Sequence, residues 1–360
     1  MGIKKLIGVL LFFSLVLSGC NTKEPEVATT DEFDSIEIVD TTETSETTPV
    51  ETTESEPEAK STYRFNPHLY SKTVGDAIPD DYYQALYNLI DALREGKDTF
   101  ECPSQEAYDW ATLDTTLNNL FPAACMKVTG VSNDGTIPYE NGIGRIYYKM
   151  PADEFVIREA EYEAEIEEVL NTWLEDDDTD FEKCLKLYDY MESTFIYGNP
   201  DPSVTGDGAD YCAFECKTGI CEHIASIYAY LLMQSGVEAM NIGIFEPDMC
   251  HAWTYVVIDG RGYHVDATWS LKKYIGTDDL YLAYFMMSGD LRESTGCLLN
   301  DITAPLLPRY WASYYEGMDF EATDKSYEFP ESGIFKELDE ENKILYYYDL
   351  DNNQQQMSYA

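Results

Sequence analysis

Apolar residues recur at helical spacing along the first regularly patterned part of the chain. Residues 80–97 place apolar side chains three and four positions apart, as one face of an amphipathic helix requires. Residues 153–174 and 180–195 show the same spacing, and the acidic run between them separates two helices. The pattern predicts a mainly helical region from about residue 63 to 125, with two long helices further on. The apolar positions of the first helix are Tyr83, Leu86, Leu89, Ile90 and Leu93.

Short runs rich in β-branched and aromatic residues predict the strands. Two such runs, 125–132 and 144–150, flank a turn region rich in Gly and Asn, and further strands are expected from about Asn241 to Trp269. Residues 332–360 predict a strand, a polar turn and a strand, so the C-terminal extension 311–360 is expected to contain a β-hairpin. The mixture predicts an α+β fold with a helical N-terminal part and a short C-terminal β appendage.

The stretch Lys217–Gly236, "KTGICEHIASIYAYLLMQSG", predicts the most apolar helix of the chain. Helical spacing indicates one buried face, Ser235-Gly236 suits the helix end, and Thr218 or Gly219 is the expected N-cap. Cys221 then lies in the first turn, where unpaired N–H groups and the helix dipole favour a thiolate and could stabilise an oxyanion. On position alone, the alternative is a buried cysteine that only fills space.

The chain begins with a basic and then an apolar segment. Lys4 and Lys5 precede the apolar run Leu6–Leu17, which is too short to span a bilayer comfortably. The following Leu-Ser-Gly-Cys20 resembles the lipobox of bacterial lipoproteins, in which the signal is cut before a cysteine that then carries lipid. Residues 1–19 are therefore expected to be a lipoprotein signal peptide and Cys20 the lipidation site. The alternative is an ordinary signal peptide with an incidental cysteine. The expected location is extracytoplasmic, lipid-anchored to the bacterial cell membrane.

Residues 20–62 are dominated by Thr, Glu, Ser and Pro. Such a segment buries too little apolar surface to offset the entropy lost on ordering, so we expect a disordered acidic stalk. The stalk would hold a domain at residues 63–310 off the membrane. The formal net charge of the whole chain is −45, which disfavours nucleic acid as a partner.

Nine cysteines are spread irregularly along the chain. Removing Cys20 leaves an even number in an oxidising location, so disulfides are open, although their pairing cannot be read from the sequence. Cys212, Cys216, Cys221 and His223 could suggest zinc, but their spacing is not one of the common zinc patterns. We therefore predict no metal and no cofactor.

Residues 251–270, "HAWTYVVIDGRGYHVDATWS", predict two strands around Asp259-Gly260, a strong signal for a two-residue hairpin turn. Continuing the strand pairing away from that turn places Trp253 opposite Asp266. His251 and Asp266 then share one face as diagonal neighbours about 7–8 Å apart, a gap that side chains can close to a hydrogen bond. A longer loop would change the register.

A cysteine at a helix start, with His251 and Asp266 on one hairpin face, supplies a nucleophile, a base and an orienting group. His251 would take the thiol proton of Cys221 or hold the thiolate as an ion pair. Asp266 would fix the ring tautomer and support the imidazolium. The alternative is two ordinary polar residues on a solvated strand face, and spacing alone leaves both interpretations open.

Three motifs in this order resemble the transglutaminase-like superfamily: "YDYMESTFIYG", "GICEHIASIYAYLLMQSGV" and "HAWTYVVIDGRGYHVDATW". Members of this superfamily have a papain-like cysteine fold, and bacterial members carry G-x-C, H-A-W and D-x-T-W. The resemblance covers about residues 187–293, and "LYLAYFMMSGDLRE" is similar to a segment of secreted members from Gram-positive bacteria. It implies a core in which a helix-borne cysteine packs on an antiparallel sheet.

Carried over residue by residue, the resemblance implies that Cys221 is the nucleophile, His251 the base and Asp266 the third member. It implies thioester chemistry on Gln side-chain amides or peptide bonds, with the acyl group passed to a Lys amine or to water. The expected partner is a protein or peptide substrate, with a cell-wall peptide among the candidates. The alternative function is a catalytically inactive module of this fold that binds or scaffolds at the cell surface.

The sequence departs from the family next to the cysteine. Many bacterial members have Gly-Tyr where this chain has His223-Ile224, which puts substrate preference and activity in question. Tyr197 matches the position of an upstream oxyanion donor. Trp253 shares the face of His251 and is a candidate to line an acyl-binding groove, whereas Trp269 falls on the other face in this register. Packing is the alternative for both tryptophans.

Several other residues compete for roles near the site. His223 and His264 are alternatives to His251 as the base. Cys250 points to the opposite strand face from His251 and is expected to be buried or bridged. His68 is isolated in the sequence and is expected to be structural.

Overall fold

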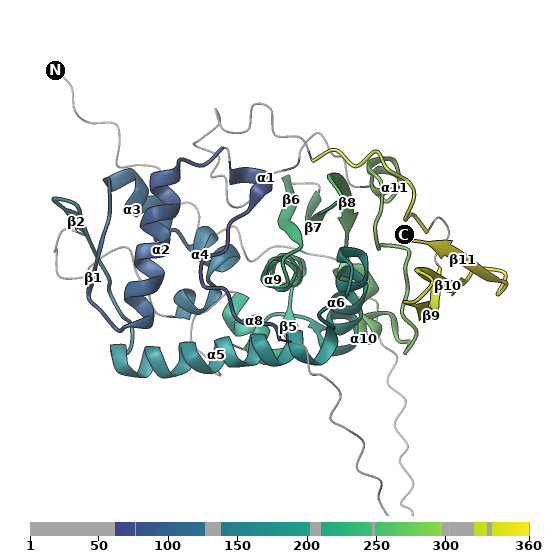
Figure 1. Cartoon of the computed structure of the whole chain (residues 1–360), viewed down its shortest axis with the longest axis horizontal. Coiled ribbons are helices and arrows are strands. Elements are labelled where there is room, and N and C mark those ends of the chain that lie inside the picture. The colour runs from purple at the N-terminus through teal and green to yellow at the C-terminus, as the bar shows by residue number, and fades with distance from the viewer. Residues whose placement is uncertain are drawn as a thin grey trace, which may run out of the picture. The chain divides into compact units, whose positions relative to one another are not determined.

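The computed structural model in Figure 1 describes residues 62–75, 77–126, 138–201, 210–246, 249–296, 302, 320–329 and 333–359. The expected signal peptide, the lipidation site at Cys20 and all but the last residue of the expected stalk lie outside the described residues. Across the described ranges, no helix has the length and apolar character needed to cross a bilayer.

The N-terminal part is helical, as the apolar spacing predicts. Helix α2 (Asp80–Arg94) carries Asp80 and Asp81 in its first turn, where negative charge complements the helix dipole. All the apolar positions predicted for this helix are buried. The other elements of this part are α1 (Lys72–Gly75), α3 (Gln105–Ala111), α4 (Asp114–Leu120) and the 3-10 helix η1 (Pro122–Met126).

A small antiparallel sheet packs beside these helices, with the order β1-β3-β2. Its strands are β1 (Thr99–Glu101), β2 (Tyr139–Glu140) and β3 (Ile143–Arg145). The strand predicted at 144–150 is therefore correct only at its start. The strand predicted at 125–132 is wrong at its first two residues, which end η1, and its remainder lies outside the described residues.

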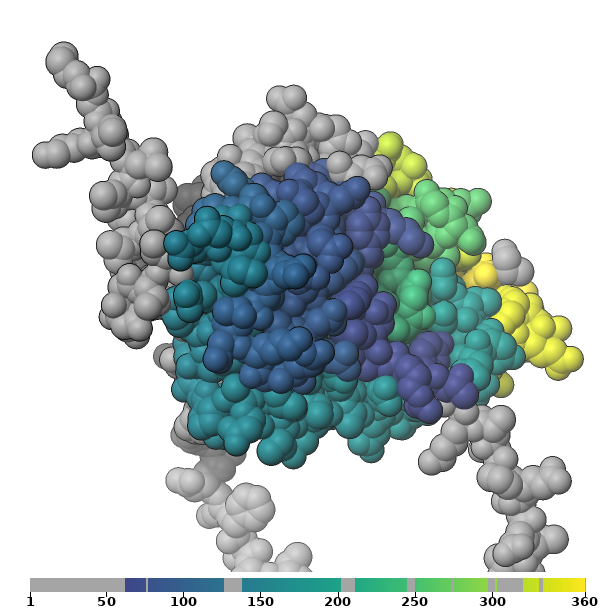
Figure 2. All heavy atoms as spheres, turned by 60° about the vertical axis from the view of Figure 1, so that its left-hand side comes forward, coloured from purple at the N-terminus to yellow at the C-terminus, as the bar shows by residue number. Residues whose placement is uncertain are grey.

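Two long helices follow, α5 (Ala152–Trp173) and α6 (Asp180–Thr194), with the predicted acidic break between them. Helix α6 begins with a capping box: the Glu182 N–H donates to Thr179 Oγ1 at 3.3 Å, and the Thr179 N–H donates to Glu182 Oε2 at 2.6 Å. Figure 2 shows the purple and blue atoms of the N-terminal helices lying against the teal atoms of α5.

Helix α9 (Cys221–Gln234) lies at the centre of the core. In Figure 1 it is seen end-on between the N-terminal helices and the strands β6 to β8. It contacts α4, α6, α8 (Asp210–Cys216), β6 and β7, so it is buried nearly all round rather than on the single face predicted. The predicted end at Ser235-Gly236 is confirmed: Val237 N–H donates to Leu232 O and Gly236 N–H to Met233 O, a Schellman motif with Gly236 at φ 89°.

An antiparallel sheet with the order β6-β7-β8 packs on α9. Its strands are β6 (Glu238–Glu246), β7 (Met249–Ile258) and β8 (Arg261–Val265). The predicted turn is confirmed, because Asp259 and Gly260 have φ of 51° and 74° and Ile258 pairs with Arg261. Close to α9, the short strands β4 (Ile196–Tyr197) and β5 (Thr218–Gly219) pair in parallel.

The segment 278–293 is mostly irregular and runs along the free side of β8. Backbone hydrogen bonds join His264 to Met287 in both directions, and the Asp266 N–H donates to Tyr284 O at 2.9 Å. These bonds cover an edge that would otherwise be open for pairing. The short helices around this segment are η2 (Ala267–Ser270), α10 (Lys272–Ile275) and α11 (Gly289–Ser294).

The C-terminal extension ends in three antiparallel strands, one more than predicted. They are β9 (Ile334–Asp339), β10 (Ile344–Tyr348) and β11 (Gln354–Ser358), in the order β11-β10-β9. The Gln-rich β11 has no apolar alternation that would predict it. Lys343 Nζ and Tyr359 OH both donate to Glu182 Oε1, at 2.8 and 2.7 Å, and so tie this sheet to α6.

Candidate active site

Cys221 is the first residue of α9, as its predicted position in the first turn requires. The predicted N-cap is wrong, because Ile220 rather than Thr218 or Gly219 precedes the helix. Thr218 and Gly219 are instead drawn into pairing with β4. The backbone N–H of Ile220 donates to His223 Nδ1 at 3.2 Å, so a histidine side chain stabilises the turn that leads into the cysteine.

His223 is accommodated because residue 219 is a glycine. A Cβ on Gly219 would lie 2.8 Å from the Cβ of His223, closer than real side chains approach. Burial lowers the pKa of His223 to about 4, so the ring is neutral near pH 7 and can accept the Ile220 N–H. At the position where this chain departs from the family motif, the structure therefore shows a side chain that caps the loop before Cys221.

Cys221 is 5% exposed and packs with Ala225 and Ala252. Ala252 directly follows His251 on β7, so the cysteine lies beside the strand position that carries the histidine. The Thr254 hydroxyl donates to Ala225 O at 2.9 Å and joins the first turns of α9 to the same strand. Helix start and strand start are thus held together by packing and by a buried hydrogen bond.

His251 and Asp266 form a short hydrogen bond, with Nε2 and Oδ2 2.6 Å apart. The two residues are 6% and 0% exposed. Because an ionised Asp266 can only accept, the proton of a neutral His251 ring lies on Nε2 and leaves Nδ1 as the basic nitrogen. The pairing of β7 with β8 keeps the predicted register as far as Thr254 and Val265.

Beyond Val265 the predicted register is wrong, because β8 ends and Asp266 starts the turn η2. Asp266 Oδ1 accepts the Thr268 N–H at 3.2 Å and so bends the chain out of the strand. The bend carries Trp269 back over His251, where the rings stack with centroids 4.7 Å apart and planes 17° apart. Trp269 therefore lies on His251 rather than on the other face, and it is half-buried.

Trp253 does not line an open groove, because it is 1% exposed. Its Nε1–H donates to His264 Nδ1 at 3.0 Å. His264 is 0% exposed, and burial together with the nearby charge of Arg292 lowers its pKa to about 3. His264 is therefore a neutral, enclosed acceptor and a poor alternative to His251 as the base.

Arg292 of α11 joins this cluster although the sequence pattern did not point to it. It is 0% exposed, and its Nη2 lies 3.1 Å from Asp266 Oδ2. The guanidinium carbon lies 4.2 Å from the ring centroid of Trp253 and 4.8 Å from that of Trp269. The only sequence signal is a lone Arg in a short acidic helix, and such residues usually lie on the surface.

The electrostatic setting keeps Asp266 ionised. Burial alone would raise the pKa of Asp266, but the charges of His251 and Arg292 and the hydrogen bonds that the carboxylate accepts outweigh it and lower the pKa. A carboxylate that stays ionised at neutral pH can hold the His251 ring in one tautomer and stabilise its protonated form.

Tyr197, the expected oxyanion donor, lies in β4 and pairs with Gly219 of β5. The next residue continues the pairing, since the Gly198 N–H donates to Gly219 O at 3.1 Å. The structure therefore brings half-buried Tyr197 to the strand that leads into Cys221.

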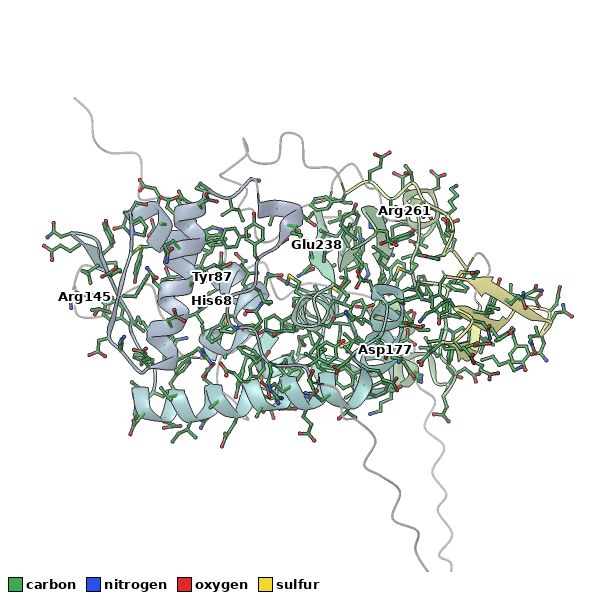
Figure 3. All side chains as sticks on the ribbon, in the orientation of Figure 1. His68, Tyr87, Arg145, Asp177, Glu238 and Arg261 are labelled. Carbon is green, nitrogen blue, oxygen red and sulfur yellow. The ribbon has the colours of Figure 1, made fainter. Side chains whose placement is uncertain are left out.

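The sequence also raised Cys212, Cys216, Cys250 and His68 as candidates. Cys212 and Cys216 of α8 have their sulfurs 3.8 Å apart, and no group of three potential metal ligands occurs within the described residues. Cys250 is exposed, so the expectation of burial is wrong. His68 stacks on Tyr87 with ring centroids 4.6 Å apart and binds Asp91 Oδ1 at 2.8 Å. Figure 3 labels His68 and Tyr87 next to each other in the N-terminal part.

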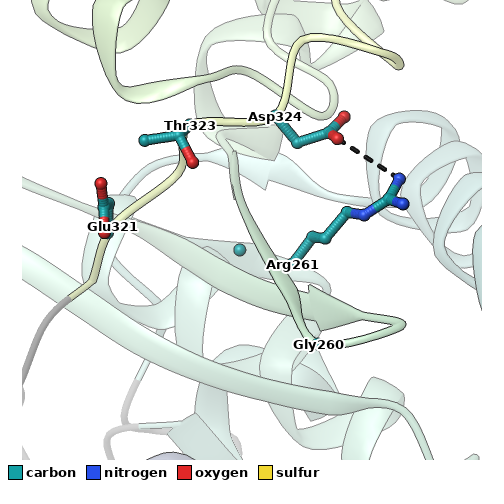
Figure 4. A pocket seen from close by; sticks show the side chains of 6 residues that line it. Gly260, Arg261, Glu321, Thr323 and Asp324 are labelled. Atoms are coloured by element: carbon teal, nitrogen blue, oxygen red, sulfur yellow. Dashed lines mark ion pairs between the residues drawn. The ribbon is translucent and has the colours of Figure 1, made fainter.

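A polar hollow of about 370 Å³ lies at the other end of the β7–β8 hairpin (Figure 4). It is bounded by the ion pair between Arg261 Nη1 and Asp324 Oδ2, 3.3 Å apart. The candidate catalytic residues are not among those that line it, which are Gly260, Arg261, Gly262, Glu321, Thr323 and Asp324. Its open, polar character gives no support for a second site.

A cysteine that opens a buried helix, beside a histidine–aspartate pair on an antiparallel sheet, places this chain among the cysteine-enzyme folds. Residues 168–267 match the model of the transglutaminase-like superfamily. The match includes Cys221, His251 and Asp266. The N-terminal helices, α11 and the C-terminal sheet lie outside it.

Two solved structures are similar over part of the chain. One, described as a putative cysteine protease from Cytophaga hutchinsonii, is 17% identical and covers 30% of this chain and 38% of its own, with a TM-score of 0.24. The other, described as a putative protease from Parabacteroides distasonis, is 12% identical and covers 37% and 30%, with a TM-score of 0.24. The chain thus spans less than half of either structure. No curated protein matches the chain.

Proposed function

We propose that this chain is a cysteine enzyme of the transglutaminase-like type that acts on peptide or Gln amide bonds. The observation that carries the proposal is the buried hydrogen bond between His251 Nε2 and Asp266 Oδ2, with Cys221 packed beside the same strand start. Asp266 directs Nδ1 of the ring away from itself and makes it the available base. The family match over residues 168–267 supports the same assignment.

The reaction follows from these roles. Proton transfer from Cys221 to His251 Nδ1 gives a thiolate, which attacks the carbonyl carbon of the amide and forms a tetrahedral oxyanion. The backbone N–H groups at the start of α9 are candidate donors to that oxyanion, with Tyr197 as a second. The imidazolium returns the proton to the leaving nitrogen, so ammonia or an amine departs and a thioester remains on Cys221.

The second half of the reaction releases the acyl group. A Lys amine or a water molecule attacks the thioester, His251 takes its proton, and the Cys221 sulfur leaves as the thiolate. An amine gives a crosslink and water gives deamidation or cleavage. The two outcomes share the acyl-enzyme and differ only in the acceptor that reaches it.

The location and partners are part of the proposal. The basic and apolar N-terminus followed by Cys20 supports a lipid anchor in a bacterial cell membrane, with residues 20–62 as the stalk. An enzyme placed there would meet proteins or peptides outside the cytoplasm, with cell-wall peptide among the candidates.

One observation favours a second candidate, a catalytically inactive module that binds or scaffolds at the cell surface. Cys221 is only 5% exposed, which limits the access of a substrate carbonyl to its sulfur. A thiol so enclosed that it stays protonated would be a packing group of the kind expected for a structural cysteine.

Alkylation across pH separates the two candidates. The full chain and its Cys221→Ala variant are treated with iodoacetamide from pH 5 to 10, and labelling is read at each cysteine by mass spectrometry. A short peptide with one cysteine serves as the control in the same reaction, since an ordinary thiol reacts mainly near and above about pH 8.5. Labelling of Cys221 well below the pH at which the control peptide reacts supports the enzyme. Labelling of Cys221 only in denaturant would contradict the proposal that the chain is an enzyme.

Transfer to a labelled primary amine then tests the chemistry. The full chain is incubated with a Gln-containing peptide and the amine, and the products are analysed by mass spectrometry. Amine incorporation indicates acyl transfer, and a gain of the mass of water with peptide cleavage indicates proteolysis. Either product must disappear in Cys221→Ala.

A further inference from the structure

Arg292 is a buried charge that the proposed chemistry does not yet use. Its side chain is 0% exposed, and arginine is almost never fully buried unless its charge is paired. The carboxylate that pairs with it, Asp266, is equally buried. Burying an ion pair costs free energy through desolvation, and this pair lies directly next to the His251–Asp266 hydrogen bond.

The contacts of Asp266 divide between its two oxygens. Oδ2 faces His251 Nε2 at 2.6 Å and Arg292 Nη2 at 3.1 Å, while Oδ1 accepts the Thr268 N–H at 3.2 Å. Both oxygens are therefore held, and the one that faces His251 also faces the guanidinium. Within the described residues, Arg292 Nε and Nη2 form no well-aligned hydrogen bond, so Arg292 acts on Asp266 mainly through its charge.

Two tryptophans hold the guanidinium in place. Its carbon lies 4.2 Å from the ring centroid of Trp253 and 4.8 Å from that of Trp269, within the range of a cation–π interaction. Trp269 also stacks on His251 at 4.7 Å. One ring thus touches both the candidate base and the cation, so any shift of Arg292 would be transmitted to His251.

We propose that Arg292 is a positioning residue of this site, which holds Asp266 Oδ2 toward His251 Nε2, so that Nδ1 is presented to Cys221. The role rests on the proposed function, because it matters only where His251 serves as a base. Arg292 lies outside the residues 168–267 that match the superfamily, so the family match does not assign it.

The charges of the cluster give the expected direction. When Cys221 is a thiolate and His251 is protonated, the formal charges of these two residues and of the ion pair Asp266–Arg292 add up to zero. Without Arg292 the same state carries a net negative charge in a buried setting, so each loss of a proton becomes less favourable. The other titratable groups around the pair are His264 on β8, Tyr188 on α6 and Tyr284 before α11.

The test compares Arg292→Met, Arg292→Lys and the parent as full chains, with the rate of Cys221 alkylation measured across pH. Arg292→Met is expected to move the pH profile upward by about one unit, the effect of removing a charge close to the titrating groups. Arg292→Lys keeps the charge and is expected to keep the profile. Arg94→Met, which removes the ion pair with Glu163 (2.7 Å) in the N-terminal part, is the control for lost stability.

A purely structural role would lower the amount of folded protein at every pH without moving the profile. A folded Arg292→Met variant with the parental profile would overturn the proposal. If Arg292→Met does not fold, Arg292→Gln takes its place in the same comparison, and a parental profile in that variant would equally overturn the proposal.

A second measurement does not depend on thiol chemistry. In ¹⁵N-histidine-labelled full chain, the proton on His251 Nε2 is assigned by its loss in His251→Gln. Its downfield NMR signal is expected in the parent and in Arg292→Lys, and should move upfield in Arg292→Met as the bond to Asp266 loosens. A displaced His251 signal in Arg292→Met, together with a Cys221 that does not react, would support the positioning role of Arg292 and contradict the proposed enzymatic function. An unchanged signal in Arg292→Met would reject the positioning role, whatever the reactivity of Cys221.

Discussion

Asp266 and Glu182 are both buried carboxylates with a cationic partner, yet their surroundings differ. Asp266 is 0% exposed and faces His251 and Arg292, which are themselves buried. Glu182 is 1% exposed and is held by the α6 capping box, by Tyr359 and by Lys343, whose side chain is 32% exposed. Both carboxylates have a lowered pKa in spite of burial, that of Glu182 to about 2 through its hydrogen bonds.

The two carboxylates represent a candidate reactive site and a tether, a contact that only attaches one element to another. The Lys343 ammonium reaches solvent, so its pairing with Glu182 is screened and serves mainly to attach the C-terminal sheet to α6. Asp266 is fully buried, and one of its partners is a histidine, a residue type that can serve as a general base. Altering Asp266 should change chemistry, whereas altering Glu182 should change stability.

The largest expected effect comes from removing the reacting groups. Cys221→Ala should abolish amine incorporation or peptide cleavage, because no thioester can form. His251→Ala should lower the rate by about 10²–10⁴-fold, the usual contribution of a general base. Product formation by mass spectrometry checks both, and turnover that survives in Cys221→Ala would remove the nucleophile assignment.

The next largest effect is expected for Asp266→Asn. The rate should fall by about 10²–10⁴-fold if Asp266 both fixes the tautomer of His251 and stabilises its protonated form. The amide would leave the buried Arg292 unpaired, so a loss of stability is expected as well. Measuring the rate per folded molecule, with folding followed by circular dichroism, separates the two effects. A variant with a full rate per folded molecule would show that Asp266 is only structural.

Glu182→Gln should lower the free energy of unfolding by about 1–3 kcal/mol, the range for a charged hydrogen-bonded group. The amide can still cap α6, but it loses the charge that faces Lys343. Chemical denaturation gives the loss, and the pH profile of Cys221 alkylation should stay unchanged. A displaced profile would contradict the division between tether and site.

Two neutral histidines should also make the stability depend on pH. The pKa of His264 is lowered to about 3 and that of His223 to about 4, against about 6.5 in an unfolded chain. Between about pH 4 and 6.5 the unfolded state binds more protons, so the free energy of unfolding falls as pH falls, by about 1.4 kcal/mol per pH unit for each residue. His264→Gln should remove about half of that slope in denaturation curves at pH 7, 6 and 5. An unchanged slope would show that His264 is not kept neutral.

Local patterns allowed much of the framework to be predicted. The apolar spacing of α2 predicted its buried residues, and Asp259-Gly260 predicted the hairpin turn, because both depend on neighbours within a few positions. The position of Cys221 at a helix start and the shared neighbourhood of His251 and Asp266 followed from the same rules. Their catalytic roles stay predictions until the alkylation and transfer experiments are done.

The predictions from the sequence were wrong where segments far apart in the chain contact one another. Trp269 was placed on the wrong face because Asp266 caps a turn and ends β8, which strand alternation does not foresee. Helix α9 was expected to bury one face, but helices distant in the sequence cover the other. Cys250, expected to be buried or bridged, is exposed near the start of β7 and forms no disulfide within the described residues.

Residue types and their spacing were enough to predict the helices, the turn, the acidic break and the three residues of the candidate triad, because they act over short stretches. Three placements needed the folded chain: Arg292 against Asp266, His223 as a cap on the loop before Cys221, and Trp253 in an enclosed position. These placements depend on packing between segments far apart in the chain, and an ion pair buried at such a contact leaves no periodic trace in the sequence.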